Sequence, residues 1–150
     1  MPEPEFRYSG NSLAYGRGRD NPIGLKLAFR WDGKTASAEF TPGVYHQGWP
    51  DIVHGGLILA LLDEAAGSAV SFCHLNCMSA RVQIELNYPA KINEPLTVTA
   101  SVREIKRRLV VTDTRVSDKN GNEIAGGEVT LIIVKPEYLE FYRNGKQISA

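Results

Sequence analysis

The feature that most constrains the fold of this chain is an apolar run at residues 54–70, which begins His-Gly-Gly. Its apolar residues fall on every side of a helix, and a single amphipathic stripe does not describe them. A helix of this kind has to be wrapped by other elements. Asp63 and Glu64 are the only acids in the run, and a carboxylate is costly to bury unless it has a partner or a function. Both acids are therefore candidate site residues.

A membrane span does not account for this run. A span needs about 20 consecutive apolar residues, whereas this run is shorter and carries its two adjacent acids near the centre. We therefore expect a core helix that is covered by a sheet on one side and by a second surface, such as another subunit, on the other. Accordingly, we expect no membrane partner and a homo-oligomer, either a dimer or a tetramer.

Length and composition predict one globular domain over residues 1–150, with an N-terminal arm at 1–21 and a C-terminal tail at 136–150. Hydrophobic residues make up 43% of the chain and charged residues 23%, which argues against disorder. The 17 basic residues balance the 17 acidic ones, so no overall field attracts nucleic acid. No basic segment followed by an apolar run begins the sequence, so we expect a cytoplasmic protein.

Cys73 and Cys77 are the only cysteines, and His74 lies between them. A structural zinc site uses about four ligands with paired spacings, and the chain has no second cluster to complete one. We therefore expect free thiols, no metal site and no cofactor.

A β-hairpin is predicted before the apolar run. Apolar residues alternate over residues 23–31, and Asp32-Gly33 then supplies a turn into a second strand at residues 35–41. Two prolines and two glycines follow in residues 42–53, which indicates a long irregular connection. Such loops often carry function, although packing of the aromatic ring and solvation of the polar groups is an equal alternative. The side chains that are candidates to face a site are His46, Gln47, Trp49 and Asp51.

Four further strands are predicted after the apolar run. Apolar and polar residues alternate strictly over residues 81–88, which indicates a strand with one buried face. The same alternation predicts three more strands, at about 98–102, 110–116 and 123–135. A type I′ turn is predicted at Asn120-Gly121 and a short helix at 137–143. Short connections favour neighbouring antiparallel strands, so we expect a four-stranded meander. The fold class is α+β, an antiparallel sheet that curls around one long helix.

Four segments carry a family resemblance. They are Asn-Pro-Ile-Gly-Leu at 21–25, the stretch from His46 to Gly56, Leu-Leu-Asp-Glu-Ala at 61–65 and the stretch from Ser79 to Pro89. Together they resemble the hotdog-fold acyl-CoA thioesterases of the phenylacetate-pathway (PaaI-like) type. The resemblance covers about residues 21–135. Its most specific part is the His-Gly-Gly motif, followed nine positions after its His by an acid.

The resemblance implies a sheet wrapped around the helix, with pairs of subunits that join their sheets and build the active site between them. It implies that Gly55 donates its backbone N–H to the thioester carbonyl, and that Asp63 of the partner subunit supplies the acid. Ser79 matches a hydroxyl position that helps to place the attacking water in some relatives. The partners implied are an acyl-CoA substrate and a second copy of the chain.

Other residues are assigned to the surroundings of the substrate, namely His54, Gly56, Gln47 and Gly48. Certain relatives carry an Asn two positions after the loop His. Gly48 stands there in this chain, so that role is either absent or taken by Gln47. Relatives often carry a cysteine pair just before the Asn-Pro, where this chain has Ala14 and Arg17. We interpret this departure as structural.

The chemistry of a thioesterase fits these residues independently of the family. Hydrolysis needs hydrogen-bond donors where charge develops on the carbonyl oxygen, and a helix N-terminus has unpaired N–H groups. Gly55 and Gly56 let the backbone approach closely because they lack a Cβ. A carboxylate then acts as a general base on water or as a nucleophile through a mixed anhydride. Both routes stay open, and only the family spacing favours Asp63 over Glu64.

Each of these residues also has a structural interpretation. The two glycines permit a tight entry into a helix, and His54 is a common type of hydrogen-bonding residue at a helix start. Asp63 is alternatively a paired core acid. Ser79 is alternatively an ordinary hydroxyl at a strand start.

A basic cluster at Arg103, Lys106, Arg107 and Arg108 is the densest in the chain. Arginine binds phosphate in a bidentate manner, so Arg107 and Arg108 are candidates to hold the phosphates of coenzyme A. A solvated hairpin tip is the alternative.

Two competing functions remain from the sequence. Hydration or dehydration of an enoyl thioester is disfavoured, because the glutamate found fourteen residues after the loop His in fatty-acid dehydratases is Ala60 here, counted from His46. A non-catalytic acyl-CoA binder or sensor is the other, although no DNA-reading module is present to make it a transcription regulator. The sequence does not define the acyl group, or whether coenzyme A or a carrier protein bears it.

Overall fold

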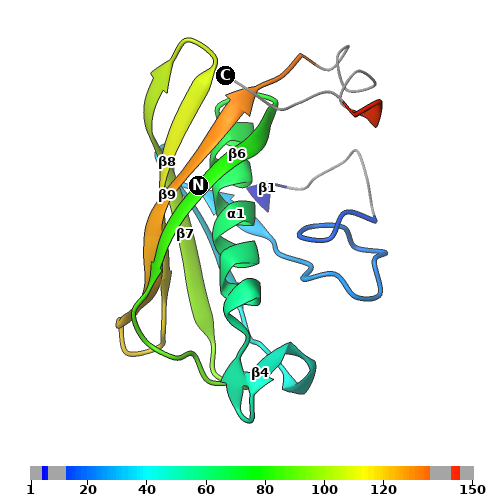
Figure 1. Ribbon diagram of the computed structural model, residues 1–150, viewed down its shortest axis with the longest axis vertical. Coiled ribbons are helices and arrows are strands. Elements are labelled where there is room, and N and C mark those ends of the chain that lie inside the picture. The colour runs from blue at the N-terminus through cyan, green and yellow to red at the C-terminus, as the bar shows by residue number, and fades with distance from the viewer. Residues whose placement is uncertain (1–4, 7–12, 136–142, 146–150) are drawn as a thin grey trace.

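The helix α1 (Gly55–Phe72) packs against one face of a curved antiparallel sheet in the computed structural model (Figure 1). The structure describes residues 5–6, 13–135 and 143–145. The buried residues of the helix are Leu57, Ile58, Leu61, Leu62, Ala65, Ala66, Ser68, Ala69 and Val70. The prediction of a core helix covered by a sheet is therefore confirmed.

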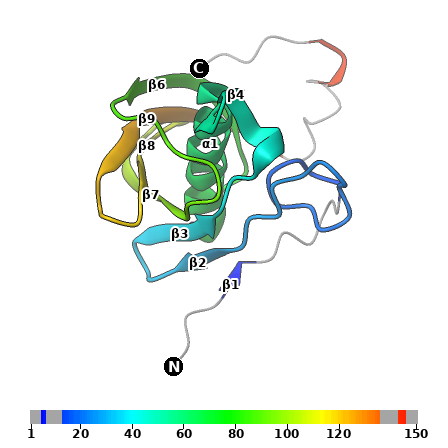
Figure 2. The same ribbon diagram turned by 90° about the horizontal axis from the view of Figure 1, so that it is seen from below.

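Seven strands form this sheet among the described residues, in the order β1-β2-β3-β7-β8-β9-β6 (Figure 2). Their bounds are β1 (Glu5–Phe6), β2 (Phe29–Trp31), β3 (Thr35–Phe40), β6 (Cys77–Leu86), β7 (Leu96–Lys106), β8 (Leu109–Ser117) and β9 (Glu123–Ile133). All neighbouring pairs are antiparallel. The α+β class, with a sheet that curls around one long helix, agrees with the sequence prediction.

A small hairpin lies between β3 and α1, in the stretch predicted to be irregular. It consists of β4 (Gln47–Trp49) and β5 (Ile52–Val53), and the 3-10 helix η1 (Val44–His46) precedes it. Figure 1 shows it at the end of the molecule where α1 begins. This hairpin delivers the chain to the start of the helix.

The order of the strands corrects the predicted meander. β6 pairs with β9 and not with β7, the next strand in the sequence. The reason lies in residues 87–95, which cross the start of α1 instead of turning back. The N–H of Val53 donates to the carbonyl of Ala90 at 2.8 Å, and Ile52 forms an isolated bridge with Lys91. This crossing places β6 at the edge of the described sheet.

The face of β6 toward the helix is less covered than the alternation predicts. Ile84 packs against the core, but Val82 and Leu86 are 44% and 54% exposed. β6 is an edge strand, so β9 alone lies beside it, and α1 does not cover its outer side. The face of β6 that was expected to be buried is therefore only partly buried in the single chain.

The strand predicted over residues 23–31 is limited to residues 29–31. Leu25 and Leu27 are nevertheless buried, as the alternation predicts. Residues 13–28 include the described part of the predicted N-terminal arm and continue to β2, and from here on we call these residues the arm. Their backbone groups form hydrogen bonds with one another instead of with β3. The N–H of Leu25 donates to the carbonyl of Tyr15 at 2.8 Å, and the N–H of Leu27 donates to the carbonyl of Gly16 at 2.9 Å. The arm is therefore a folded loop.

The predicted type I′ turn at Asn120-Gly121 is wrong. Such a turn needs a positive φ at both residues, and only Gly121 has one, at 82°. The carboxylate of Asp118 accepts the N–H groups of Asn120 and Asn122, each at 2.9 Å, which holds a longer loop. Residues 137–142 of the predicted C-terminal helix lie outside the described residues.

Candidate active site

The first turn of α1 leaves one backbone N–H without an acceptor among the described residues. Nδ1 of His54 accepts the N–H of Gly56 at 2.8 Å, and the carbonyl of His54 accepts the N–H of Leu57 at 3.0 Å. Gly55 is the first helical residue, so its N–H has no intrahelical acceptor. His54 thus caps the helix through Gly56, and Gly55 remains as the donor at the positive end of the helix dipole.

Gly55 borders a cavity of about 250 Å³. The cavity is lined by Val53, Gly55, Ile58 and the residues from Leu86 to Ala90. A Cβ at Gly55 would lie 3.3 Å from Cδ1 of Leu86, so glycine keeps this wall open. Most of the lining side chains are apolar, and a hydrogen bond from an N–H is stronger in such surroundings than in water. The site suits a polarised carbonyl group.

Asp63 lies at the middle of α1, where its carboxylate faces β6. The hydroxyl of Ser79 donates to Oδ1 of Asp63 at 2.5 Å. Asp63 is half-buried, and Ser79 is exposed within the single chain. An ionised carboxylate has two acceptor oxygens, so this bond orients the group and leaves Oδ2 available.

A bulge in β6 aims Ser79 at the helix. β6 is in register with β9 at Val82 and Val129, and again at Ser79 and Leu131, with a shift between the two pairs. Side chains alternate along a regular strand. Ser79 and Val82 are three residues apart and share a face because the bulge inserts one extra residue. Both partners, Val129 and Leu131, are buried against the helix.

Glu64 has a different partner from its neighbour Asp63. Its Oε2 lies 3.3 Å from Nε of Arg17 in the arm, and the two side chains are 24% and 14% exposed. Burial raises the pKa of Glu64, the charge of Arg17 lowers it, and the charge of Asp63 raises it. Glu64 is therefore held in a largely buried ion pair. Sequence reasoning missed this pair because no local pattern links residues 47 positions apart.

Gly55 and Asp63 of one chain are too far apart to serve one carbonyl group. They are eight residues apart on one helix, which corresponds to about 12 Å at 1.5 Å per residue. Reacting atoms need to approach to about 3–3.5 Å. A site that uses both groups therefore requires a second copy.

The loop residues singled out in the sequence lie beside the helix start. Oε1 of Gln47 accepts the N–H of Asp51 at 2.6 Å, so this oxygen already has a partner. A Cβ at Gly48 would lie 3.2 Å from Cα of His54, and close packing accounts for this glycine. Trp49 is 78% exposed, so it does not pack within the chain.

One member of the basic cluster is engaged on the outer face of the sheet. Arg103 binds Asp113 at 2.8 Å, and it also pairs with Glu128. These hydrogen bonds and charges raise the pKa of Arg103. Its guanidinium is therefore already paired with carboxylates, which disfavours Arg103 as a phosphate ligand.

Arg107 and Arg108 form the tip between β7 and β8, and both are exposed. In the sheet, Ser79 is in register with Leu131, and Leu131 is in register with Val110. β6 and β8 are therefore two strand spacings apart, so Ser79 and Val110 lie about 10 Å from each other. Because Arg108 is two residues from Val110, the tip lies at the same end of the sheet as Ser79. The structure does not bring the tip and Gly55 into one cavity.

No group of three or more His, Cys, Asp or Glu side chains that could hold a metal occurs among the described residues. Cys73 and Cys77 are free thiols. Burial raises the pKa of both thiols, that of Cys77 to about 11. Both therefore stay protonated at neutral pH and are weak nucleophiles.

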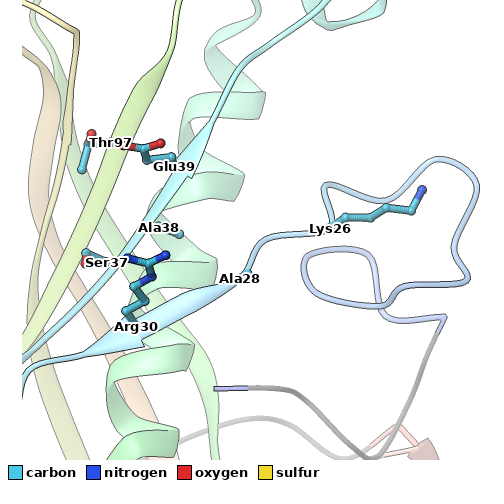
Figure 3. A pocket seen from close by; sticks show the side chains of 7 residues that line it. All are labelled: Lys26, Ala28, Arg30, Ser37, Ala38, Glu39 and Thr97. Carbon is cyan, nitrogen blue, oxygen red and sulfur yellow. The ribbon is translucent and has the colours of Figure 1, made fainter. Parts of the chain in front are cut away.

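A cavity of about 410 Å³ lies elsewhere, where the arm and β2 diverge from β3 (Figure 3). Figure 3 shows Arg30, Glu39 and Thr97 on neighbouring strands and Lys26 on the arm. The residues that line this larger cavity do not include Gly55, Asp63 or Ser79. Size alone therefore does not locate the candidate active site.

Comparison with known families gives a match over residues 51–125 to a model described as the thioesterase superfamily, and this stretch is half of the chain. The chain belongs to the thioesterase superfamily. The matched stretch includes Gly55, Asp63 and Ser79, and the sheet wrapped around one helix is the hotdog fold. The family and the fold implied by the sequence resemblance are confirmed.

Individual relatives are distant. Acyl-coenzyme A thioesterase THEM4 of Xenopus laevis is 24% identical over 96 residues, which are 64% of this chain and 43% of that protein. The structure of thioesterase superfamily protein RHA08564 gives a TM-score of 0.76 at 22% identity, over 82% of this chain and 61% of the other. The PaaI protein of the E. coli phenylacetic acid degradation operon gives 0.68 at 21% identity, over 72% and 83%. This chain thus spans less than two thirds of the first two relatives.

Proposed function

We propose that this chain hydrolyses the thioester of an acyl-CoA to a free acid and CoA, in a dimer that shares its active sites between two copies. The observation that carries the proposal is the pair of groups on α1. Gly55 offers an N–H beside an apolar cavity, and Asp63 offers a carboxylate oriented by a hydroxyl. The first suits the charge that develops on a carbonyl oxygen, and the second suits attack on its carbon. The name of the THEM4 relative supports acyl-CoA as the substrate class.

The edge of β6 supports pairing with a second copy, because an edge strand presents unpaired backbone groups. Consider two β6 strands that pair antiparallel about a two-fold axis at Gln83, with the bulged residue left out of the count. Leu86 then lies opposite the partner's Ser79. Leu86 lines the cavity at Gly55, and Ser79 binds Asp63. This register therefore brings Gly55 of one copy next to Asp63 of the partner subunit.

The reaction follows from this arrangement. The N–H of Gly55 donates to the thioester carbonyl oxygen and stabilises the negative charge as that carbon is attacked. The partner's Ser79 orients the partner's Asp63 toward the carbon. The C–S bond then breaks, and the CoA thiolate leaves and takes up a proton. The tip at Arg107 and Arg108 is our candidate for the phosphates of CoA.

Asp63 has two possible roles in the attack. As a general base it takes a proton from water, and the hydroxide oxygen forms the new bond to the acyl carbon. As a nucleophile it forms a mixed anhydride, which water then hydrolyses. Mass spectrometry of enzyme quenched during turnover distinguishes the routes, because an acylated Asp63 forms only on the nucleophilic one.

A panel of acyl-CoA thioesters tests the function. The purified protein is mixed with short, medium, long and aromatic acyl-CoA, and the CoA released is measured with a thiol reagent. We expect turnover of at least one class at a rate well above the uncatalysed reaction. Tight binding of acyl-CoA without release of CoA would make the chain a binder and would refute the hydrolase.

Mixed dimers test the shared site. Gly55→Pro deletes the N–H, and proline is tolerated at the first helical position. Gly55→Ala is the matched control, because it adds a Cβ but keeps the N–H. Both Gly55→Pro and Asp63→Asn dimers should be inactive, whereas a dimer of one Gly55→Pro copy and one Asp63→Asn copy contains one intact site. We expect the mixed dimer to recover about half of the wild-type rate, and an inactive mixed dimer would place both groups of a site in one chain.

A further inference from the structure

The arm is fastened to α1 at the residue that follows Asp63. Gly16 is buried, and a Cβ there would fall 2.0 Å from Cδ of Glu64, so the backbone of the arm lies directly on this carboxylate. Arg17 then pairs with Glu64 through Nε at 3.3 Å. Its guanidinium extends along the helix, where a Cβ at Gly67 would lie 4.0 Å from Nη2. Two consecutive residues of the arm, Gly16 and Arg17, therefore contact the carboxylate of Glu64.

This contact borders the candidate active site. Neighbouring helix residues point about 100° apart, so Asp63 faces β6 while Glu64 faces the arm. Figures 1 and 2 show the arm on the side of α1 away from the sheet. The helix positions that stay exposed or half-buried between β6 and the arm are Gly56, Leu59, Ala60, Asp63 and Gly67. The arm thus forms one border of the stripe that holds Asp63.

The arm is preorganised to present Arg17. Its backbone hydrogen bonds from Leu25 to Tyr15 and from Leu27 to Gly16 hold the two residues that immediately precede Arg17. Leu25 and Leu27 are 6% and 5% exposed, and they anchor the loop in the main core. A guanidinium held by such a frame loses little conformational freedom when it pairs.

We propose that Arg17 is a positioning residue of the thioester site: its ion pair with Glu64 holds the arm beside Asp63. This inference rests on the proposed function. The charged groups that act on Glu64 are Arg17 from the arm and Asp63 from its own helix. Burial and the charge of Asp63 both favour protonation of Glu64, and Arg17 alone opposes them. Loss of Arg17 would therefore raise the pKa of Glu64 further and would release the arm.

The experiment compares Arg17→Gln, Arg17→Lys and the double variant Arg17→Gln/Glu64→Gln with wild type. Arg19→Gln is the matched control, because it removes an exposed charge from the same arm. Carbon-13 NMR follows the titration of the Glu64 carboxyl group, limited proteolysis follows the arm, and steady-state assays follow kcat against pH.

In Arg17→Gln we expect the titration midpoint of Glu64 to rise, because burial and the charge of Asp63 are then unopposed. We also expect at least ~10-fold faster cleavage in the arm and an added ionisation in the kcat profile. Arg17→Lys should restore part of each effect, and the double variant should lose the added ionisation while its arm stays sensitive to protease.

An unchanged Glu64 midpoint in Arg17→Gln, or a kcat profile identical to that of Arg19→Gln, would overturn the inference. Failure of the proposed function would look different. The wild-type protein would then hydrolyse no acyl-CoA at any pH, although the Glu64 midpoint still responded to Arg17.

Discussion

A cysteine at Gln83 should join two copies by a disulfide bond. The proposed register puts Gln83 on the two-fold axis, directly opposite its own counterpart. Facing residues of antiparallel strands have Cα atoms about 4.5–5.5 Å apart, within the range of about 4.4–6.8 Å that a disulfide needs. Gln83 is exposed in the single chain, so Gln83→Cys leaves the core undisturbed.

Glu85→Cys is the matched control. Glu85 is exposed on the same strand and lies two residues along. In the proposed register the two Glu85 residues are offset from each other by four residues along the paired strands. Their Cα atoms are therefore about 14 Å apart, at 3.4 Å per residue. No disulfide spans that distance.

Both variants are made with Cys73 and Cys77 changed to serine, which removes the native thiols. After mild oxidation, denaturing gel electrophoresis without reductant should show Gln83→Cys mainly as a dimer and Glu85→Cys as a monomer. A monomeric Gln83→Cys, or equal cross-linking of the two variants, would refute the register.

Three further predictions follow from single contacts. Burial raises the pKa of Glu64 above its ordinary value of 4.5. Protonation of Glu64 therefore stabilises the folded protein at low pH, and this stabilisation is lost as the pH rises through the folded-state pKa. Arg17→Gln raises this pKa further, so chemical denaturation should show a loss of about 1–2 kcal/mol relative to wild type at pH 8 and a smaller loss at pH 4; an equal loss at both would exclude an ion-pair origin. Ser79→Ala should lower kcat about 10-fold with little change in KM, since it frees the carboxylate that Ser79 orients, and an unchanged kcat would leave the hydroxyl without a role. Changing Arg107 and Arg108 to Ala should raise KM for acyl-CoA more than for a short thioester that lacks the nucleotide, and equal effects on both substrates would remove the phosphate role.

The central helix could be predicted from the sequence because its signal is local. The His-Gly-Gly start and the apolar run at residues 54–70 give a helix that the structure places at Gly55–Phe72. Alternation likewise located β7, β8 and β9, although β7 and β8 are longer than predicted and β9 ends two residues earlier. These patterns report on which face of an element is buried, and that face can be read from the local spacing of its apolar residues.

The partners of the two acids could not be predicted in the same way. Ser79 reaches Asp63 only because of a bulge in β6, which lies between Ser79 and Arg81 and therefore before the alternating stretch at residues 81–88 begins. Arg17 reaches Glu64 because the arm folds back on itself, which depends on backbone contacts far from the helix in sequence. The prediction of the strand order was wrong for a similar reason. Residues 87–95 have the length of a short connection between neighbouring strands, but they cross the start of α1.

The choice between the two adjacent acids is the central claim, and the turnover of two isosteric variants tests it most directly. Asp63→Asn and Glu64→Gln are compared with wild type by steady-state hydrolysis of the preferred acyl-CoA, after sedimentation has shown that both variants are folded and dimeric. We predict that Asp63→Asn lowers kcat by at least ~10²-fold while acyl-CoA still binds, because a general base or nucleophile contributes that much, and that Glu64→Gln loses about 10-fold or less. The reverse order would make Glu64 the reacting acid, and two variants as active as wild type would contradict the hydrolase itself.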